Sequence, residues 1–120
     1  EFDEILGHRQ RLFEAYKAGL KGAHGITLIG DHAPDRTHAA WLCTALVKRD
    51  RSGFMRMLRE KHIESSQVHY RNDRYSIFGG RRDDLPNMDA VEENYIVLPL
   101  HTKMTLENVS YICEAIKSGW

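Results

Sequence analysis

The stretch from Gln67 to Phe78 concentrates side chains that can bind a polar ligand. It reads Gln-Val-His-Tyr-Arg-Asn-Asp-Arg-Tyr-Ser-Ile-Phe and follows a short apolar run. Loops at strand ends often carry binding residues, because a rigid scaffold positions them. From the pattern alone, half-buried packing explains the histidine and the two tyrosines equally well. The candidate ligand contacts are seven consecutive residues: His69, Tyr70, Arg71, Asn72, Asp73, Arg74 and Tyr75.

Arginines cluster in and just after this stretch. They are Arg71, Arg74, Arg81 and Arg82. A guanidinium offers parallel donors that match phosphate oxygens, so such a cluster is typical of an anion-binding surface. A solvated face neutralised by nearby carboxylates explains the same residues, and the carboxylates available are Asp73, Asp83 and Asp84. The sequence leaves both interpretations open.

Other kinds of site have weaker support. A histidine-rich stretch matches no usual metal-ligand spacing and is predicted to be a solvated loop; its members are His24, Asp31, His32, Asp35 and His38. A nucleophilic triad would lack the Gly-x-Ser-x-Gly turn; the residues available for it are Ser65, Ser66, His69 and Asp73. The Gly79-Gly80 pair lacks the lysine and the helix start of a phosphate loop. We therefore predict no metal site and no catalytic residue in this chain.

Composition narrows the class of protein further. The 120 residues are 42% hydrophobic and 28% charged, which suits one ordinary domain spanning 1–120. Seventeen basic and seventeen acidic residues cancel, so no nucleic-acid or anionic-membrane partner is expected. Cys43 and Cys113 lie in apolar surroundings and are expected to be buried thiols, which favours a reducing, cytoplasmic location. Because the chain begins with Glu1, we expect it to be an excerpt of a longer protein.

Hydrophobic periodicity predicts a mixed architecture. The expected elements are helices near 3–21, 88–94 and 105–117, a helix after Asp50 or Ser52 that carries Phe54, Met57 and Leu58 inward, strands at 26–29, 38–47 and 95–100, and a further extended stretch from Ile63. Asp50 or Ser52 is a plausible cap of the second long helix, and Thr105 of the last one. His62 occupies a position where a C-terminal glycine is usual. The fold class expected is α+β, with helices packed on a three- to four-stranded, largely antiparallel sheet.

Several short motifs, in order, resemble a known family. They are Gln67-Val68-His69-Tyr70, Leu85-Pro86-Asn87, Leu98-Pro99-Leu100-His101 and Met104-Thr105. Together they resemble the C-terminal small domain of the DegT/DnrJ/StrS family of sugar aminotransferases. The helix of residues 1–22, which contains Arg11-Leu12-Phe13-Glu14-Ala15-Tyr16, resembles the family's interdomain linking helix, and Asp50-Arg51 resembles the opening of its internal helix.

This resemblance implies the small domain of the aspartate-aminotransferase fold (type I), in an enzyme that uses pyridoxal phosphate. It implies a homodimer that acts on a nucleotide-linked keto-sugar with an amino acid as donor. The large domain of such an enzyme holds the cofactor and its Schiff-base lysine. The lysines of this chain read as solvated, so the chain alone is expected to be inactive. They are Lys17, Lys21, Lys48, Lys61, Lys103 and Lys117.

The resemblance also implies that the His69-Tyr70 pair and the loop after it face the substrate and help to close the active site. Many relatives have a proline and a second histidine where this chain has Arg71 to Arg74, so the sugar is left open. Two alternatives remain. One is a sugar dehydratase of the same family, in which the Schiff-base lysine is replaced. The other is a free-standing α+β module that binds a metabolite or a protein without catalysis.

Overall fold

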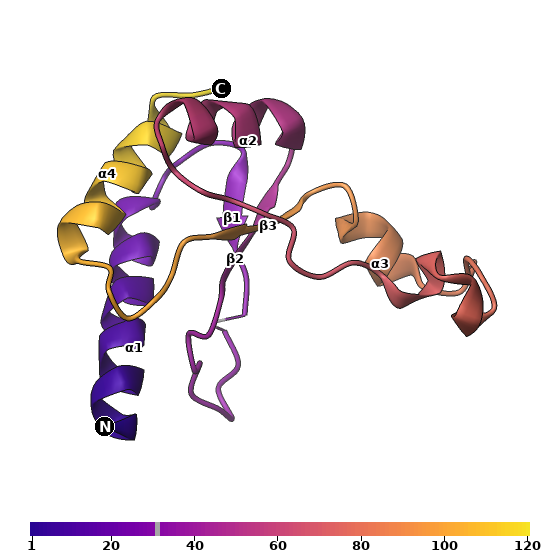
Figure 1. Ribbon diagram of the computed structural model, residues 1–120, viewed down its shortest axis with the longest axis horizontal. Helices are drawn as coiled ribbons and strands as arrows, with labels where there is room; N and C mark the ends of the chain where they lie inside the picture. Colours follow the sequence, from indigo (N-terminus) through magenta and orange to yellow (C-terminus); the bar gives the residue numbers. More distant parts are fainter. Residues whose placement is uncertain (31) are drawn as a thin grey trace.

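A computed structural model describes residues 1–30 and 32–120 (Figure 1). Its elements, in chain order, are α1 (Phe2–Gly19), β1 (Ile26–Leu28), β2 (Cys43–Val47), α2 (Arg51–Glu60), the 3-10 turns η1 (Asn72–Arg74) and η2 (Ser76–Phe78), α3 (Pro86–Val91), β3 (Tyr95–Leu98) and α4 (Leu106–Lys117). In the described ranges, no helix is long and apolar enough to cross a membrane.

The sheet has three antiparallel strands in the order β1-β2-β3. Strand β2 is central, with Val47 opposite Ile26 and Cys43 opposite Leu98. The extended stretch after Ile63 adds only an isolated bridge, between Ser66 and Val97. The predicted α+β class and antiparallel sheet are therefore confirmed, at the lower end of the expected strand number.

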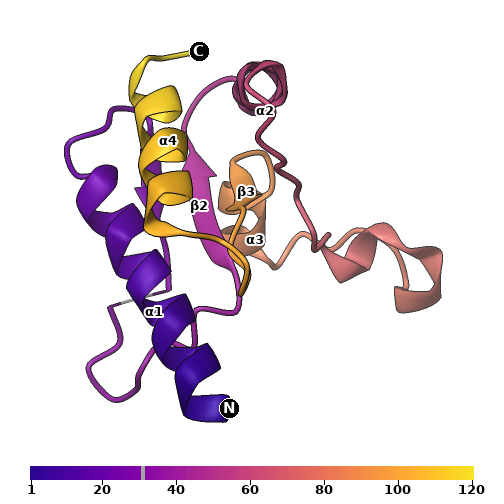
Figure 2. The same cartoon turned by 60° about the vertical axis from the view of Figure 1, so that its left-hand side comes forward.

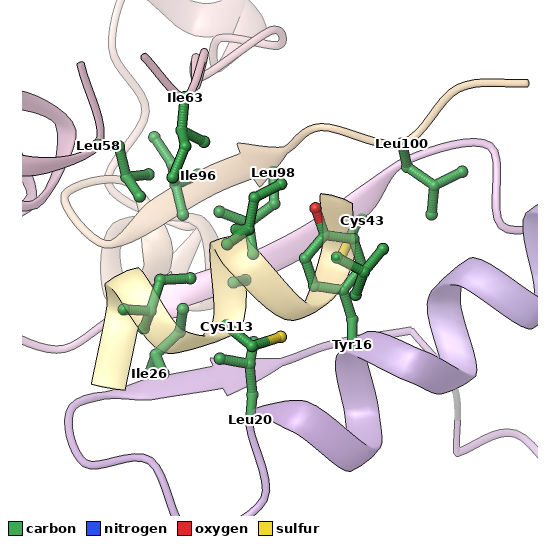
Figure 3. Packing of buried hydrophobic residues seen from close by; sticks show 14 of the residues in the cluster. Tyr16, Leu20, Ile26, Cys43, Leu58, Ile63, Ile96, Leu98, Leu100 and Cys113 are labelled. Atoms are coloured by element: carbon green, nitrogen blue, oxygen red, sulfur yellow. The ribbon is translucent and has the colours of Figure 1, made fainter. Parts of the chain in front are cut away.

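One apolar core joins the sheet to α1 and α4, which run side by side (Figures 1 and 2), and it includes Phe54, Met57 and Leu58 of α2. Figure 3 shows Tyr16, Cys43 and Cys113 packed in this core. The hydroxyl of Tyr16 donates to the carbonyl of Pro99 at 2.7 Å, so the buried polar tip is satisfied. Burial raises the pKa of the Cys113 thiol to about 11 and that of Cys43 further. The prediction of two buried thiols is confirmed.

The helix ends follow the predicted capping chemistry. The side chain of Asp50 accepts a hydrogen bond from the backbone N–H of Gly53 at 2.9 Å. Thr105 and Asn108 form a reciprocal capping box at the start of α4. His62 has a φ of 59°, so it takes the left-handed conformation for which glycine is usually chosen.

The sequence prediction for residues 38–47 is wrong in its first half. The strand begins only at Cys43, because side chains of α1 bind the preceding backbone carbonyls and keep them from pairing with a neighbouring strand. Arg9 donates to the carbonyls of Ala40 and Trp41, at 3.0 and 2.6 Å, and Ala40 has a φ of 51°. As a result Trp41 is 65% exposed and is not part of a covered strand. The short helix α3 also begins two residues earlier than predicted, at Pro86, where the fixed φ of proline suits a first helical turn.

The segment of residues 67–94, called the arm below, projects away from the sheet and its helices (Figures 1 and 2). It contains both 3-10 turns and α3. The arm leaves the body at the Ser66 bridge and returns to it at β3. Most of its side chains are exposed, so forces other than an apolar core must shape it.

Gly19 allows α1 and α4 to pack closely, and Gly19→Ala is expected to destabilise the chain. An added Cβ would lie 2.6 Å from Sγ of Cys113. Overpacking of this kind costs about 1 to 3 kcal/mol of unfolding free energy, measurable by denaturant titration. Gly7→Ala is the matched control, because its Cβ meets only Nη1 of Arg11, at 3.6 Å. This control should stabilise α1 by about 0.5 to 1 kcal/mol.

Cys113→Ala in the Gly19→Ala background tests the cause. Removing the sulfur makes room for the new methyl group, so the double variant should lose less stability than the sum of the two single changes. Strict additivity would show that Gly19 is not limited by this contact.

Candidate functional site

The interior of the arm is ionic. In the segment between Ile63 and Ile96, all of which is described, only Arg71 and Asp73 are buried. The guanidinium of Arg71 forms a two-pronged ion pair with Asp73, in which Nη2 lies 2.6 Å from Oδ2. Its Nη1 also donates to Asp89 at 2.6 Å and to Glu92 at 2.9 Å. One cation thus joins η1 to two carboxylates that come with α3.

A second layer of charge surrounds this pair. Arg81 binds the same two carboxylates, Asp89 at 3.2 Å and Glu92 at 3.0 Å. The backbone N–H of Arg82 donates to Asp73 at 2.9 Å, which leaves that buried carboxylate well satisfied. These contacts hold the loop after η2 against η1.

These ion pairs show, for each arginine of the cluster, whether it is neutralised by a nearby carboxylate or left available to bind an anion. Arg71 and Arg81 pair with carboxylates of the arm, and exposed Arg82 pairs with Asp84. Neutralisation therefore explains three of the four arginines. Arg74 alone of the four makes no ion pair with the described residues and lies on aromatic rings instead.

Charge sets the protonation of this network. The Arg71 guanidinium and the Arg82 N–H hold the pKa of Asp73 well below its usual range. Arg81 and then Arg71 lower the pKa of Glu92. The carboxylates hold the pKa of Arg71 above its ordinary value in turn, with Asp73 the largest influence. Arg71, Asp73 and Glu92 are therefore charged at neutral pH.

The solvent side of the arm carries a cation on an aromatic platform. The guanidinium of Arg74 lies 4.4 Å from the ring centroid of Tyr70 and 5.5 Å from that of Tyr75. Both tyrosines are about half exposed, and Arg74 and Asn72 are exposed as well. A stacked guanidinium keeps its edge donors free, so Arg74 on this platform can bind an anionic group.

His69 lies next to a residue that the sequence analysis did not select. Its imidazole ring is 6.0 Å from the indole of Trp41, at an angle of 51°, and both side chains are exposed. The pattern placed Trp41 on a covered strand, and only the unusual φ of Ala40 turns it outward. A clue was available in the loop signals of residues 31–37, which run directly into this supposed strand.

The seven predicted residues therefore divide into two sets. Five are exposed, namely His69, Tyr70, Asn72, Arg74 and Tyr75, and the other two, Arg71 and Asp73, are buried against each other. A groove of about 650 Å³ lies between Ser66, Leu100 and α4, and none of the seven lines it. The exposed residues thus form an open surface, which encloses a ligand only when another surface covers it.

The weaker candidate sites stay apart from this surface. Among the described residues, no three histidine, cysteine or carboxylate side chains gather as a metal-ligand set. Asp31 lies outside the described residues. His38 stacks on Phe13 with ring centroids 4.5 Å apart, and its Nδ1 accepts from the N–H of Ala40. That histidine therefore supports the loop before β2.

Arg71→Ala is expected to loosen the arm while the body keeps its structure. The change leaves Asp73 buried without its cation, and such an uncompensated charge is strongly unfavourable. Hydrogen exchange followed by mass spectrometry should show faster exchange in residues 67–94 and unchanged exchange in α1 and α4. Arg82→Ala is the control, because its pair with Asp84 is exposed and contributes little. Unchanged exchange of the arm in Arg71→Ala would contradict this role.

Acid should loosen the arm before it affects the body. Asp73 and Glu92 have lowered pKa values in the folded arm, so they stabilise it at any pH above their ordinary values near 4. As the pH falls below about 4, the loosened arm takes up protons that the folded arm does not, and this stabilisation is lost progressively. Hydrogen exchange between pH 6 and pH 3, corrected for intrinsic rates, measures it. An arm that keeps its protection at pH 3 would contradict the prediction.

Known proteins resemble this chain in sequence and in fold. Residues 1–117 match the family model described as the DegT/DnrJ/EryC1/StrS aminotransferase family. None of the curated proteins searched matches the chain. Among solved structures, the sugar aminotransferase CalS13 from Micromonospora echinospora is 35% identical, with a TM-score of 0.89 over 98% of this chain and 31% of that one.

Two further structures support the same fold. AtS13 from Actinomadura melliaura is 29% identical, with a TM-score of 0.89 over 98% of this chain and 31% of its own. Spr1654 from Streptococcus pneumoniae, in a PLP form, is 24% identical, with a TM-score of 0.82 over 97% of this chain and 31% of its own. This last likeness shows the fold alone. The chain thus spans about a third of the length of these relatives. On the family match over residues 1–117, the chain belongs to the DegT/DnrJ/EryC1/StrS aminotransferase family.

Proposed function

We propose that this chain is the C-terminal domain of a pyridoxal-phosphate-dependent aminotransferase that acts on a nucleotide-linked keto-sugar, with an amino acid as donor. The helix of residues 1–22 would link it to a large domain. The observation that carries the proposal is the exposed surface of His69, Tyr70, Arg74 and Tyr75, which the ion pairs of Arg71 hold in place. In the complete enzyme this surface would contact the substrate and close the active site over it.

The chemistry of this surface suits a sugar nucleotide. The guanidinium of Arg74 offers donors to diphosphate oxygens, and the rings of Tyr70 and Tyr75 that it stacks on carry hydroxyls that can add further hydrogen bonds. His69 and Asn72 are exposed nearby and can donate to or accept from sugar hydroxyls. Arg71 and Asp73 are already bonded to each other, so we assign them the task of shaping the loop.

The residues of this chain do not fit the cofactor. A Schiff-base lysine needs a desolvated setting, and all six lysines are exposed or half-buried. We therefore assign the pyridoxal phosphate to the part of the enzyme that corresponds to the unmatched two-thirds of the relatives. There the cofactor would supply the electron sink for amino transfer. A cytoplasmic homodimer, without nucleic-acid or membrane partners, is inferred from the family resemblance and the balanced charge.

In the complete enzyme, Arg74→Ala and His69→Ala should raise the KM for the nucleotide sugar. Loss of a charge-assisted contact of this kind costs roughly tenfold or more. The KM for the amino donor should change much less, because the donor lacks the diphosphate and sugar hydroxyls that these two side chains would contact. Steady-state kinetics with each substrate varied measures both. Arg36→Ala is the matched control, since Arg36 is exposed and, among the described residues, pairs with its neighbour Asp35.

Two outcomes would contradict the proposal. If the variants change both KM values equally, the surface is structural. If the complete enzyme consumes the keto-sugar without incorporating an amino group, it is a dehydratase.

The assignment of the cofactor has a test on this chain alone. Mixing the chain with equimolar pyridoxal phosphate and reducing with borohydride should leave no stoichiometric mass adduct, because its lysines are solvated. Intact-mass spectrometry measures the adduct, with a lysine-containing peptide as the reference for non-specific labelling. A saturable adduct on a single lysine would contradict the assignment.

A further inference from the structure

Trp41 is an exposed aromatic side chain that belongs to no assigned site. Its indole is 65% exposed and lies 6.0 Å from the imidazole of His69, which is exposed too. The indole N–H has no hydrogen-bond partner among the described residues. Tryptophan gains more than most residues from burial, so an indole that is 65% exposed beside a second exposed ring needs a physical reason.

Each member of this pair follows a strained residue. Ala40, just before Trp41, has a φ of 51°, and Val68, just before His69, has a φ of 59°. For a β-branched residue a positive φ is an outlier, and a tight turn closes around Val68, where the N–H of His69 donates to Gln67 at 2.6 Å. Strained backbone of this kind is concentrated at functional sites, although it also occurs at helix ends such as His62.

The backbone that carries Trp41 is firmly anchored. Arg9 donates to the carbonyls of Ala40, Trp41 and, at 3.3 Å, Leu100. Gln10 donates to the carbonyl of His38 at 3.1 Å, and the side chain of Ala40 is buried. Helix α1 therefore fixes the loop up to the Cα atom of Trp41. The exposure of the indole is therefore set by an anchored backbone and does not result from a flexible loop.

We propose that Trp41 is a specificity-determining residue that packs its indole against the apolar C–H face of the substrate's sugar ring, beside His69. This inference rests on the proposed function. The indole supplies a flat, uncharged surface, and the imidazole next to it supplies a hydrogen-bonding group for the hydroxyls at the ring edge. The diphosphate would bind to Arg74, which stacks separately on Tyr70 and Tyr75. The arm and the loop before β2 thus share recognition of one substrate.

The experiment compares Trp41→Ala and Trp41→Phe with the wild type in the complete enzyme. Trp41→Ala should raise the KM for the nucleotide sugar about tenfold, and Trp41→Phe should recover part of that loss because a smaller flat ring remains. The KM for the amino donor should not change. The inhibition constant of the nucleoside diphosphate without its sugar should not change either, since Trp41 would contact only the sugar. Tyr111→Ala is the control, as Tyr111 is a half-exposed aromatic on α4.

Every other outcome overturns the inference. An unchanged sugar KM in Trp41→Ala shows that the indole makes no contact. If the inhibition constant of the nucleoside diphosphate rises as much as the sugar KM, Trp41 contacts the nucleotide instead of the sugar. If the donor KM rises as much as the sugar KM, the role of Trp41 is structural. A wild-type enzyme that is inactive on nucleotide sugars overturns the proposed function together with this inference. Activity of the wild type with normal Trp41→Ala kinetics overturns this inference alone.

Discussion

The buried guanidinium of Arg71 is the interaction on which the shape of the arm depends. The arm has no apolar interior of its own. Within residues 67–94, all of which are described, only Arg71 and its partner Asp73 are buried. Burying such a pair is favourable only when nearly every donor and acceptor is satisfied. Arg71 meets this condition through Asp73, Asp89 and Glu92, and Asp73 meets it through Arg71 and the Arg82 N–H.

The sheet and its helices are stabilised by hydrophobic burial, whereas the arm is stabilised by ion pairs. The core of aliphatic and aromatic side chains gains stability from area removed from water, which responds little to pH or salt. The arm is expected to respond to both, because its contacts are charges with partly exposed partners. One chain thus joins a rigid base to a segment whose order depends on ionisation. Substrate phosphates near Arg74 would add negative charge beside the same network.

Sequence reasoning succeeded where local chemistry decides the structure. The caps at Asp50 and Thr105 and the apolar stripe of α4 depend on neighbours within a few residues, and the structure has them as predicted. It failed at Ala40 and Trp41, because the hydrogen bonds that end the strand come from Arg9, distant in sequence. For the same reason no local pattern distinguished Arg71, bonded to distant Asp89 and Glu92, from solvent-facing Arg74.

Two strained turns bring Trp41 and His69 together. Ala40 and Val68 occur in different parts of the chain, yet each turns the following aromatic residue toward the other. The cost of a left-handed conformation at an alanine and a valine is offset by stronger local structure, from Arg9 at one turn and from the Ser66 bridge with the ion pairs of the arm around the other. Neither turn improves the core. What both achieve is a fixed aromatic pair on an open surface, at the junction of the body and the arm.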